Sequence, residues 1–160
     1  MSSVRKPISK VAQRTRLSAL AEELHQQKLS IVTTNGCFDV LHPGHISYLN
    51  QAKDLGDIFI VGINSNRSVA KLKGPKRPIH DEQDRALQIA ALECVDFVSV
   101  FDEDTPETLI QIIRPSIHVK GGDYKLEDLP EKAVIESVGG KIVLLPFLSG
   151  HSTTKILDSL

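Results

Sequence analysis

The chain has 160 residues, 41% of them hydrophobic, which is enough to build the core of one domain. Its 19 basic and 20 acidic residues leave a formal net charge of -1, which argues against general binding to nucleic acids or membrane surfaces. No apolar run approaches the roughly 18 residues that span a membrane, and the two cysteines, Cys37 and Cys94, form no CxxC pair. We therefore expect a single cytoplasmic domain over residues 1–160.

Residues 1–28 are predicted to form a helical leader. A polar amphipathic helix is expected around residues 11–27, because apolar residues recur there at helical spacing. The first sixteen residues, "MSSVRKPISKVAQRTR", are basic and contain no acid. An organelle presequence is therefore the alternative to a leading helix of the domain.

Five short apolar strands then alternate with helices. The first strand, 30–35, is rich in β-branched residues. The helix after it is expected to start at Pro43 and to end before Gly56. The second strand, 57–63, is a continuous apolar run, which is typical of a strand buried on both faces. Strands are also expected at 97–101, 116–120 and 141–147, and helices at 81–92, 105–113, 128–138 and 152–160. This alternation predicts an open, parallel α/β sheet with helices on both faces.

Polar loops follow all five predicted strands. They read "NGCFDVLHPGH", "NSNRS", "FDEDTP", "KGGDY" and "LSGHSTT". In sheets of this kind, ligands bind beyond the carboxyl ends of the strands. Glycines in these loops let backbone N–H groups approach a ligand, and the loop "AKLKGPKRPIH" adds the cations Lys71, Lys73, Lys76 and Arg77. This edge therefore resembles a phosphate site, although the chain lacks both the GxxxxGK(S/T) loop and a GxGxxG after its first strand.

The stretch "GCFDVLHPGH" carries the most specific chemistry. Pro43 suits the first turn of a helix, and Gly44 leaves room for a phosphate. His42 and His45, three residues apart, can both face an anion bound at the helix N-terminus. The alternatives are a capped helix start without function and a zinc site with Cys37, which would lack a fourth ligand.

This stretch resembles the first motif of the nucleotidyltransferases with the HxGH signature. The later segments "LKGPKRP", "DRALQIAALECVDFV", "EDTP", "VKGGDY" and "GHSTTKI" are similar, in this order, to heptose 1-phosphate adenylyltransferases in their stand-alone form. The resemblance covers roughly residues 31–156 and implies a Rossmann-like three-layer sandwich with a five-stranded parallel sheet. It also implies transfer of AMP from ATP, with Mg²⁺ bound to it, to D-glycero-D-manno-heptose 1-phosphate. The products would be pyrophosphate and ADP-heptose for lipopolysaccharide or another surface polysaccharide.

The resemblance assigns the site residue by residue. His42, His45 and Lys73 would be catalytic, and Lys71 and Lys73 would bind substrate phosphate. The nucleotide would contact Asn35, Gly36, Cys37, Phe38, Asp39, His42, Gly44, His45, Arg85, Gly121, Gly122, Asp123, Tyr124, Ser152, Thr153 and Thr154. No residue is assigned as a metal ligand. A homodimer and a separate sugar kinase upstream are implied as partners.

The implied chemistry needs no general base. A sugar 1-phosphate is largely dianionic at pH 7, since its second pKa is about 6, and its oxygen can attack the α-phosphorus of ATP directly. Positioning and charge neutralisation then carry catalysis, without a covalent nucleophile. Cys37 is therefore expected to be a loop residue and Cys94 a core residue.

Several alternatives stay open. The enzyme could instead be a cytidylyltransferase for a polyol phosphate such as glycerol 3-phosphate, or the domain could bind nucleotides without turnover. Residues 102–104 are three consecutive acids that could ligate a metal or simply favour the start of the next helix, for which Thr105 is the expected cap. Residues 152–154 could cap the last helix rather than bind phosphate.

Overall fold

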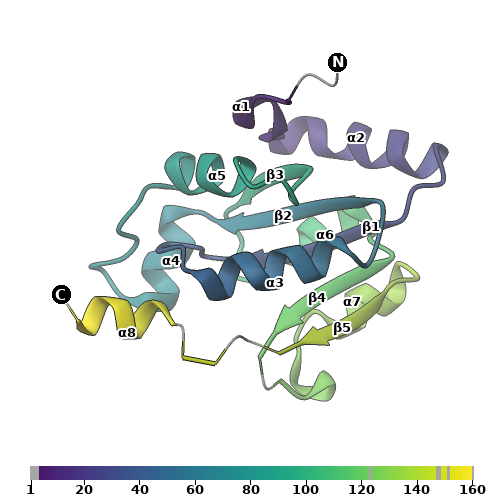
Figure 1. Cartoon of the computed structure of the whole chain (residues 1–160). Helices are drawn as coiled ribbons and strands as arrows, with labels where there is room; N and C mark the ends of the chain where they lie inside the picture. Colours follow the sequence, from purple (N-terminus) through teal and green to yellow (C-terminus); the bar gives the residue numbers. More distant parts are fainter. Residues whose placement is uncertain (1–3, 123, 147–148, 151, 160) are drawn as a thin grey trace.

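The computed structural model describes residues 4–122, 124–146, 149–150 and 152–159. Five strands form one sheet in the order β3-β2-β1-β4-β5, and every neighbouring pair is parallel (Figure 1). The strands are β1 (Ile31–Gly36), β2 (Ile58–Asn64), β3 (Phe97–Phe101), β4 (Ile117–Gly121) and β5 (Lys141–Leu145). The predicted Rossmann-like parallel sheet is thus confirmed, with strand limits within two residues of the expected ones.

Helices connect these strands and cover both faces of the sheet (Figure 1). They are α1 (Pro7–Lys10), α2 (Arg14–Gln26), α3 (Pro43–Lys53), α4 (Asn66–Lys73), α5 (Glu82–Ala90), α6 (Glu107–Ile113), α7 (Lys132–Ser137) and α8 (Thr153–Asp158), with a 3₁₀ turn η1 (Leu126–Asp128). None of the described helices combines the length and apolarity that a membrane crossing requires.

The core consists of one layer of apolar side chains on each face of the sheet. Successive strand residues point to opposite faces, so alternate apolar residues of one strand enter different layers. In β2, Phe59 and Val61 pack with α3 and α5, whereas Ile60 packs with α2 and α6. This two-sided burial is the reason why β2 reads as a continuous apolar run.

Helix α2 belongs to this core. Its residues Leu17, Ala21 and Leu24 are buried, and Leu17 and Leu24 pack with Ile31 of β1 and Ile113 of α6. The segment expected to be a leader therefore covers one face of the sheet.

Helix α4 was not predicted from the sequence, where its residues were expected to lie in loops. Ser65 caps the helix by accepting a hydrogen bond from the N–H of Ser68, and Val69 is fully buried beneath it. Gly74 ends the helix with a φ of 99°, which favours glycine. Lys71 and Lys73 therefore project from a helix at the edge of the sheet rather than from a flexible loop.

Helix α6 also begins later than predicted. Pro106, not Thr105, occupies the cap position before Glu107, and the hydroxyl of Thr105 donates instead to the carboxylate of Glu107. Similarly, α7 starts only at Lys132, because Pro130 and the 3₁₀ turn η1 precede it.

The chain order reverses between β1 and β4. β1 connects forward to β2 on one side, and β4 lies on its other side, with Thr33 opposite His118. A crevice beyond the carboxyl ends of the two strands is the usual ligand site in such a sheet. The expected ligand site is therefore next to Asn35, Gly36 and Gly121, which end these strands.

Candidate active site

A cavity of about 600 Å³ lies at this edge of the sheet. Most of its wall comes from segments that follow the carboxyl ends of β1 to β4. It is lined by Asn35, Gly36, Cys37, Phe38, Asp39, His45, Tyr48, Asn64, Leu72, Lys73, Arg77, Asp104, Thr105, Pro106, Lys120, Gly121, Tyr124, Asp128, Leu129, Pro130, Glu131 and Thr154. The structure thus brings together residues from the "GCFDVLHPGH", "LKGPKRP", "EDTP", "VKGGDY" and "GHSTTKI" segments.

The two histidines lie at the N-terminus of α3, as predicted. His42 is the N-cap residue in an extended conformation, and Pro43 is the first helical residue. The imidazole rings of His42 and His45 stack with their centroids 3.8 Å apart, and Phe38 contacts His45 edge-on at 5.4 Å. Stacking holds both rings at the start of the helix, where the N–H groups of His45 and Ile46 donate to the carbonyl oxygen of His42. This arrangement can donate hydrogen bonds to an anion.

His45 is neutral at physiological pH. Burial, and secondarily the neighbouring His42, lowers the pKa of His45 to about 4. Its Nδ1 atom is buried and has no hydrogen-bond partner among the described residues. A neutral imidazole retains one N–H donor, so His45 can contact a phosphate oxygen without carrying a charge.

The loop before α3 approaches its surroundings closely. A Cβ on Gly36 would lie 2.8 Å from the ring of Phe38, so only glycine fits there without a shift of that ring. Phe38 itself has a φ of 45° and is buried. Burial raises the pKa of the Cys37 thiol, which therefore stays protonated and is a poor nucleophile.

Asp39 lines the cavity, but its carboxylate is engaged by protein groups. It accepts hydrogen bonds from Nε of Arg77 at 2.6 Å and from the backbone N–H groups of Ile79 and His80 at 2.8 to 3.0 Å. Burial alone would raise the pKa of Asp39, but these hydrogen bonds and the Arg77 charge lower it overall. Asp39 thus fixes the 77–80 segment against the first motif.

Arg85, predicted to face the nucleotide, lies beneath the cavity instead. It is fully buried, and its guanidinium donates to the carbonyl oxygens of Cys37, Asn64 and His80. A fourth hydrogen bond goes to the side chain of Asn66. Arg85 therefore ties the ends of β1 and β2 to the start of α5 and does not line the cavity.

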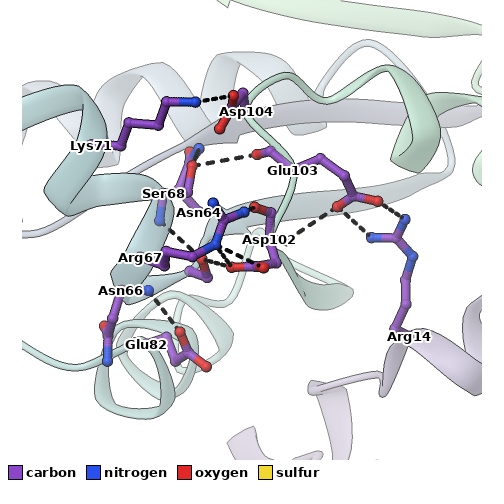
Figure 2. A network of polar contacts seen from close by, with 11 residues as sticks. Arg14, Asn64, Asn66, Arg67, Ser68, Lys71, Glu82, Asp102, Glu103 and Asp104 are labelled. Atoms are coloured by element: carbon purple, nitrogen blue, oxygen red, sulfur yellow. Dashed lines mark hydrogen bonds and ion pairs between the residues drawn. The ribbon is translucent and has the colours of Figure 1, made fainter.

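The two predicted phosphate lysines differ in their surroundings. Lys73 lines the cavity from the end of α4, and no ion pair engages it within the described chain. Lys71, which lies two residues earlier in α4, forms an ion pair with Asp104 (Figure 2). Lys73 is therefore available to an anion, whereas Lys71 would first have to leave Asp104.

The acidic segment 102–104 is held by cations. Asp102 pairs with Arg67, Glu103 with Arg14 and Asp104 with Lys71, each from a different turn or helix (Figure 2). Within the described parts of the chain, no three His, Cys, Asp or Glu side chains are grouped as a metal site would need. The acids serve to attach the β3–α6 loop to α4 and α2.

At the end of β4, glycines allow the backbone to come close to a ligand in the cavity. Gly122 has a φ of 106°, and its N–H donates to the carbonyl oxygen of Leu145 in β5. Gly121 and the half-exposed Tyr124 line the cavity. Asp123, which was also predicted to contact the nucleotide, lies outside the described residues.

At the start of α8, Ser152 caps the helix, whereas Thr154 lines the cavity. The hydroxyl oxygen of Ser152 accepts a hydrogen bond from the N–H of Lys155 at 3.1 Å and so caps α8. Thr153 is the first residue of α8, and Thr154 reaches the cavity.

Sequence reasoning missed several cavity residues. Lys120 and Asn64 stand at the carboxyl ends of β4 and β2, so the position rule for parallel sheets could have identified them. Glu131 gave no such signal, because its place in the wall depends on the path of the chain after Pro130.

Comparison with known proteins agrees with this geometry. The model of the Cytidylyltransferase-like family matches residues 33–158. The "lipopolysaccharide core biosynthesis protein" of Thermoplasma volcanium is 31% identical, with a TM-score of 0.62, over 75% of this chain and 97% of that one.

Two further relatives are informative. The "Bifunctional protein HldE" of Geobacter metallireducens is 49% identical over 90% of this chain, but the chain spans only 29% of its length. Pantoate-beta-alanine ligase of Francisella tularensis is 18% identical with a TM-score of 0.61, over 93% of this chain and 76% of that one, and so shares the fold.

Proposed function

Because the chain belongs to the cytidylyltransferase-like family, we propose that it transfers AMP from ATP to D-glycero-D-manno-heptose 1-phosphate, giving ADP-heptose and pyrophosphate. The observation that carries this proposal is the stacked His42–His45 pair at a helix N-terminus, with Lys73 in the wall of the same cavity. The heptose as acceptor rests on the resemblance of "VKGGDY" and "GHSTTKI" and on the 49% identity to the bifunctional relative.

In the proposed reaction, an oxygen of the sugar 1-phosphate attacks the α-phosphorus of ATP in line. The new P–O bond forms as the bond to the β-phosphate oxygen breaks, and pyrophosphate leaves with the electron pair. His42 and His45 donate hydrogen bonds to the triphosphate near the start of α3, and the ammonium of Lys73 offsets the charge that grows on the leaving group. No proton has to be removed from the dianionic acceptor.

Mg²⁺ bound with ATP would neutralise part of the phosphate charge. Two carboxylates of the cavity wall fit the role of its ligands only weakly, since Asp39 accepts hydrogen bonds from three donors and Asp104 is paired with Lys71. We propose that phosphate oxygens and water, rather than these side chains, supply most of the coordination.

The remaining predicted residues would act by contact or by support. Asn35, Gly36, Cys37, Phe38, Gly121 and Tyr124 line the cavity. The first two, the backbone of Cys37 and Phe38, and the last two would border the nucleotide. Asp39 and Arg85 would hold these segments in place. Gly44, Gly122, Asp123, Ser152, Thr153 and Thr154 complete the proposed nucleotide-binding set, and Lys71 the substrate-phosphate set.

We also propose where this reaction takes place and what accompanies it. A sugar kinase must first make the heptose 1-phosphate. The free thiols of Cys37 and Cys94 suit the reducing cytoplasm. The homodimer that the family resemblance implies remains a proposal, testable by light scattering.

Product identification tests the proposed function. The purified chain is incubated with ATP and heptose 1-phosphate, and separately with CTP and glycerol 3-phosphate. The products are identified by mass spectrometry. We expect ADP-heptose from the first mixture. CDP-glycerol from the second mixture alone would establish the cytidylyltransferase alternative, and no product from either would favour a binding module.

A further inference from the structure

A buried ion pair lines the cavity where the chain order reverses. Nζ of Lys120, at the end of β4, lies 2.5 Å from Oε1 of Glu131 and donates a hydrogen bond to Oδ1 of Asn35 at 3.0 Å. Asn35 ends β1, so this cluster bridges the crevice between β1 and β4. All three residues line the cavity. None of them has a role in the proposed transfer chemistry, apart from the predicted contact of Asn35 with the nucleotide.

A second buried layer lies behind the pair. The side chain of Glu131 is 1% exposed, and His118 Nε2 approaches its Oε1 at 3.7 Å, too far for a hydrogen bond. Nδ1 of His118 is hydrogen-bonded to the hydroxyl of Thr33 at 2.8 Å. Glu131 is therefore the more buried member of the pair, and Lys120, whose side chain is 18% exposed, is the more accessible one.

The fold gives no reason for this pair. Burying an ion pair costs desolvation free energy that its mutual attraction only partly offsets, and apolar residues often replace such pairs without loss. Glu131 is the N-cap residue of α7, yet its side chain makes no capping hydrogen bond. Its Oε1 and the Nε2 of His118 also lack hydrogen bonds of good geometry from the described residues. Groups kept at such a cost inside a cavity wall are candidates for ligand binding.

We propose that Lys120 and Asn35 bind the hydroxyl oxygens of a sugar in this cavity, and that Glu131 is the positioning residue that holds the Lys120 ammonium. The proposal rests on the proposed function, because it assumes that a nucleotide or sugar phosphate occupies the cavity. A lysine ammonium has three N–H donors, of which one is hydrogen-bonded to Asn35, whereas Glu131 holds the ammonium by charge in an ion pair. The N–H donors of Lys120 that Asn35 does not engage, together with the amide nitrogen of Asn35, can donate to neighbouring hydroxyl oxygens.

Charge decides between a hydroxyl and a phosphate as the partner. The carboxylate of Glu131 compensates the ammonium of Lys120 at 2.5 Å, so the pair presents hydrogen-bond donors with little net attraction for an anion. Burial lowers the pKa of Lys120 to about 8, and the amine is still mostly protonated at pH 7. Lys73 shows the opposite arrangement, since it lines the cavity with no ion pair among the described residues. Phosphate therefore belongs near Lys73, and a neutral hydroxyl near Lys120.

Two sugars in the reaction carry such hydroxyls, namely the ribose of ATP and the acceptor heptose. Calorimetry distinguishes them without turnover. In one arm, ATP is compared with 2′-deoxy-ATP and 3′-deoxy-ATP. In the other, heptose 1-phosphate is compared with its monodeoxy analogues, on protein saturated with α,β-methylene-ATP. A hydrogen bond to a charged donor is worth enough to expect about a tenfold preference for the hydroxylated ligand in one arm.

The test variants are Lys120→Met, Glu131→Gln and the double variant. The double variant removes both charges and so avoids a lone buried charge that could unfold the protein. The matched control is Lys132→Met/Glu136→Gln, which removes an exposed pair on α7 with the same 2.5 Å separation. Circular dichroism establishes that each variant is folded.

We expect the folded double variant to lose the preference in one arm, while the control keeps it and pyrophosphate binding is unchanged in both. A change in the ATP arm assigns the ribose, and a change in the other arm assigns the heptose. The proposal is overturned if the wild type shows no preference in either arm, if the double variant keeps it, or if that variant binds pyrophosphate about tenfold more weakly. Absence of turnover in the wild type would count against the proposed function alone, because these arms measure binding.

Discussion

The rings of His42 and His45 stack with their centroids 3.8 Å apart at the N-terminus of α3, and His45 borders the cavity. Stacking makes each ring a support for the other. In the proposed reaction the pair would act as one rigid donor group, with His42 shaping the position from which His45 would reach a phosphate.

The histidine pair gives the first prediction. Replacing His45 by Asn removes the imidazole that we propose as a donor to the triphosphate, and it should lower kcat by about 100-fold, within the range seen when one transition-state donor is lost. His42→Asn should have a similar effect, because His45 then loses its stacking partner. Pyrophosphate release measures both rates.

The control for this pair is His25→Gln. His25 lies on α2, where its Nε2 contacts the carbonyl oxygen of Ile113 at 2.9 Å, and glutamine can replace that hydrogen bond. If the His42 and His45 variants were as fast as the His25 variant, neither histidine of the pair would take part in the reaction.

Lys73 and Lys71 should contribute unequally. Lys73→Met removes the cation in the cavity wall that no described residue pairs with, and kcat/KM should fall by about 100-fold. Lys71→Met should cost about tenfold or less, since Lys71 is already paired with Asp104. Steady-state kinetics with both substrates checks the order, with Lys76→Met as the control from the neighbouring loop. A larger loss for Lys71 than for Lys73 would reverse the assignment.

Much of this site could be predicted from the sequence because its signals are local. Pro43 after His42 predicts a helix start, and apolar runs predict the strands, since both depend on neighbouring residues. Helix α4 was missed although Ser65 and Gly74 mark its two ends, because its exposed basic residues are also typical of a loop. The position of Arg85 beneath the cavity could not be foreseen. Its partners Cys37, Asn64 and His80 come together only in the folded sheet.

The buried carboxylate of Asp39 gives a prediction on stability and binding. Asp39→Asn leaves the Arg77 guanidinium without its charge partner and weakens hydrogen bonds from Ile79 and His80. The free energy of unfolding should fall by about 3 kcal/mol, as is typical of a broken buried pair. KM for ATP should rise because the cavity wall loosens. Urea denaturation and kinetics measure the two effects.

The comparison for Asp39 is Glu22→Gln, which breaks the exposed pair with Arg114. That change should cost less than about 1 kcal/mol. Equal costs for the two variants would show that Asp39 does not clamp the loop.

His118 makes stability depend on pH. Burial, and secondarily the Lys120 charge, lowers the pKa of His118 to about 3 from its ordinary value of 6.5. The unfolded chain therefore binds a proton that the folded protein excludes, and stability falls as pH drops below 6.5. Between pH 7.5 and pH 5 the loss from this group should be about 2 kcal/mol.

The pH dependence is checked by urea denaturation of the wild type and of His118→Gln at both pH values. The variant should lose less stability on acidification by about that amount. His45 acts in the same direction, because its pKa is also lowered, so a smaller slope remains. An unchanged slope in the variant would mean that His118 can take up a proton in the folded state.

The proposed adenylyl transfer is tested most directly by the rate of pyrophosphate release, measured for ATP and CTP, each with heptose 1-phosphate, glycerol 3-phosphate and other sugar and polyol phosphates. We expect kcat/KM to be highest, by at least about 100-fold, for ATP with heptose 1-phosphate in the presence of Mg²⁺. Turnover with CTP and a polyol phosphate but not with ATP would contradict it.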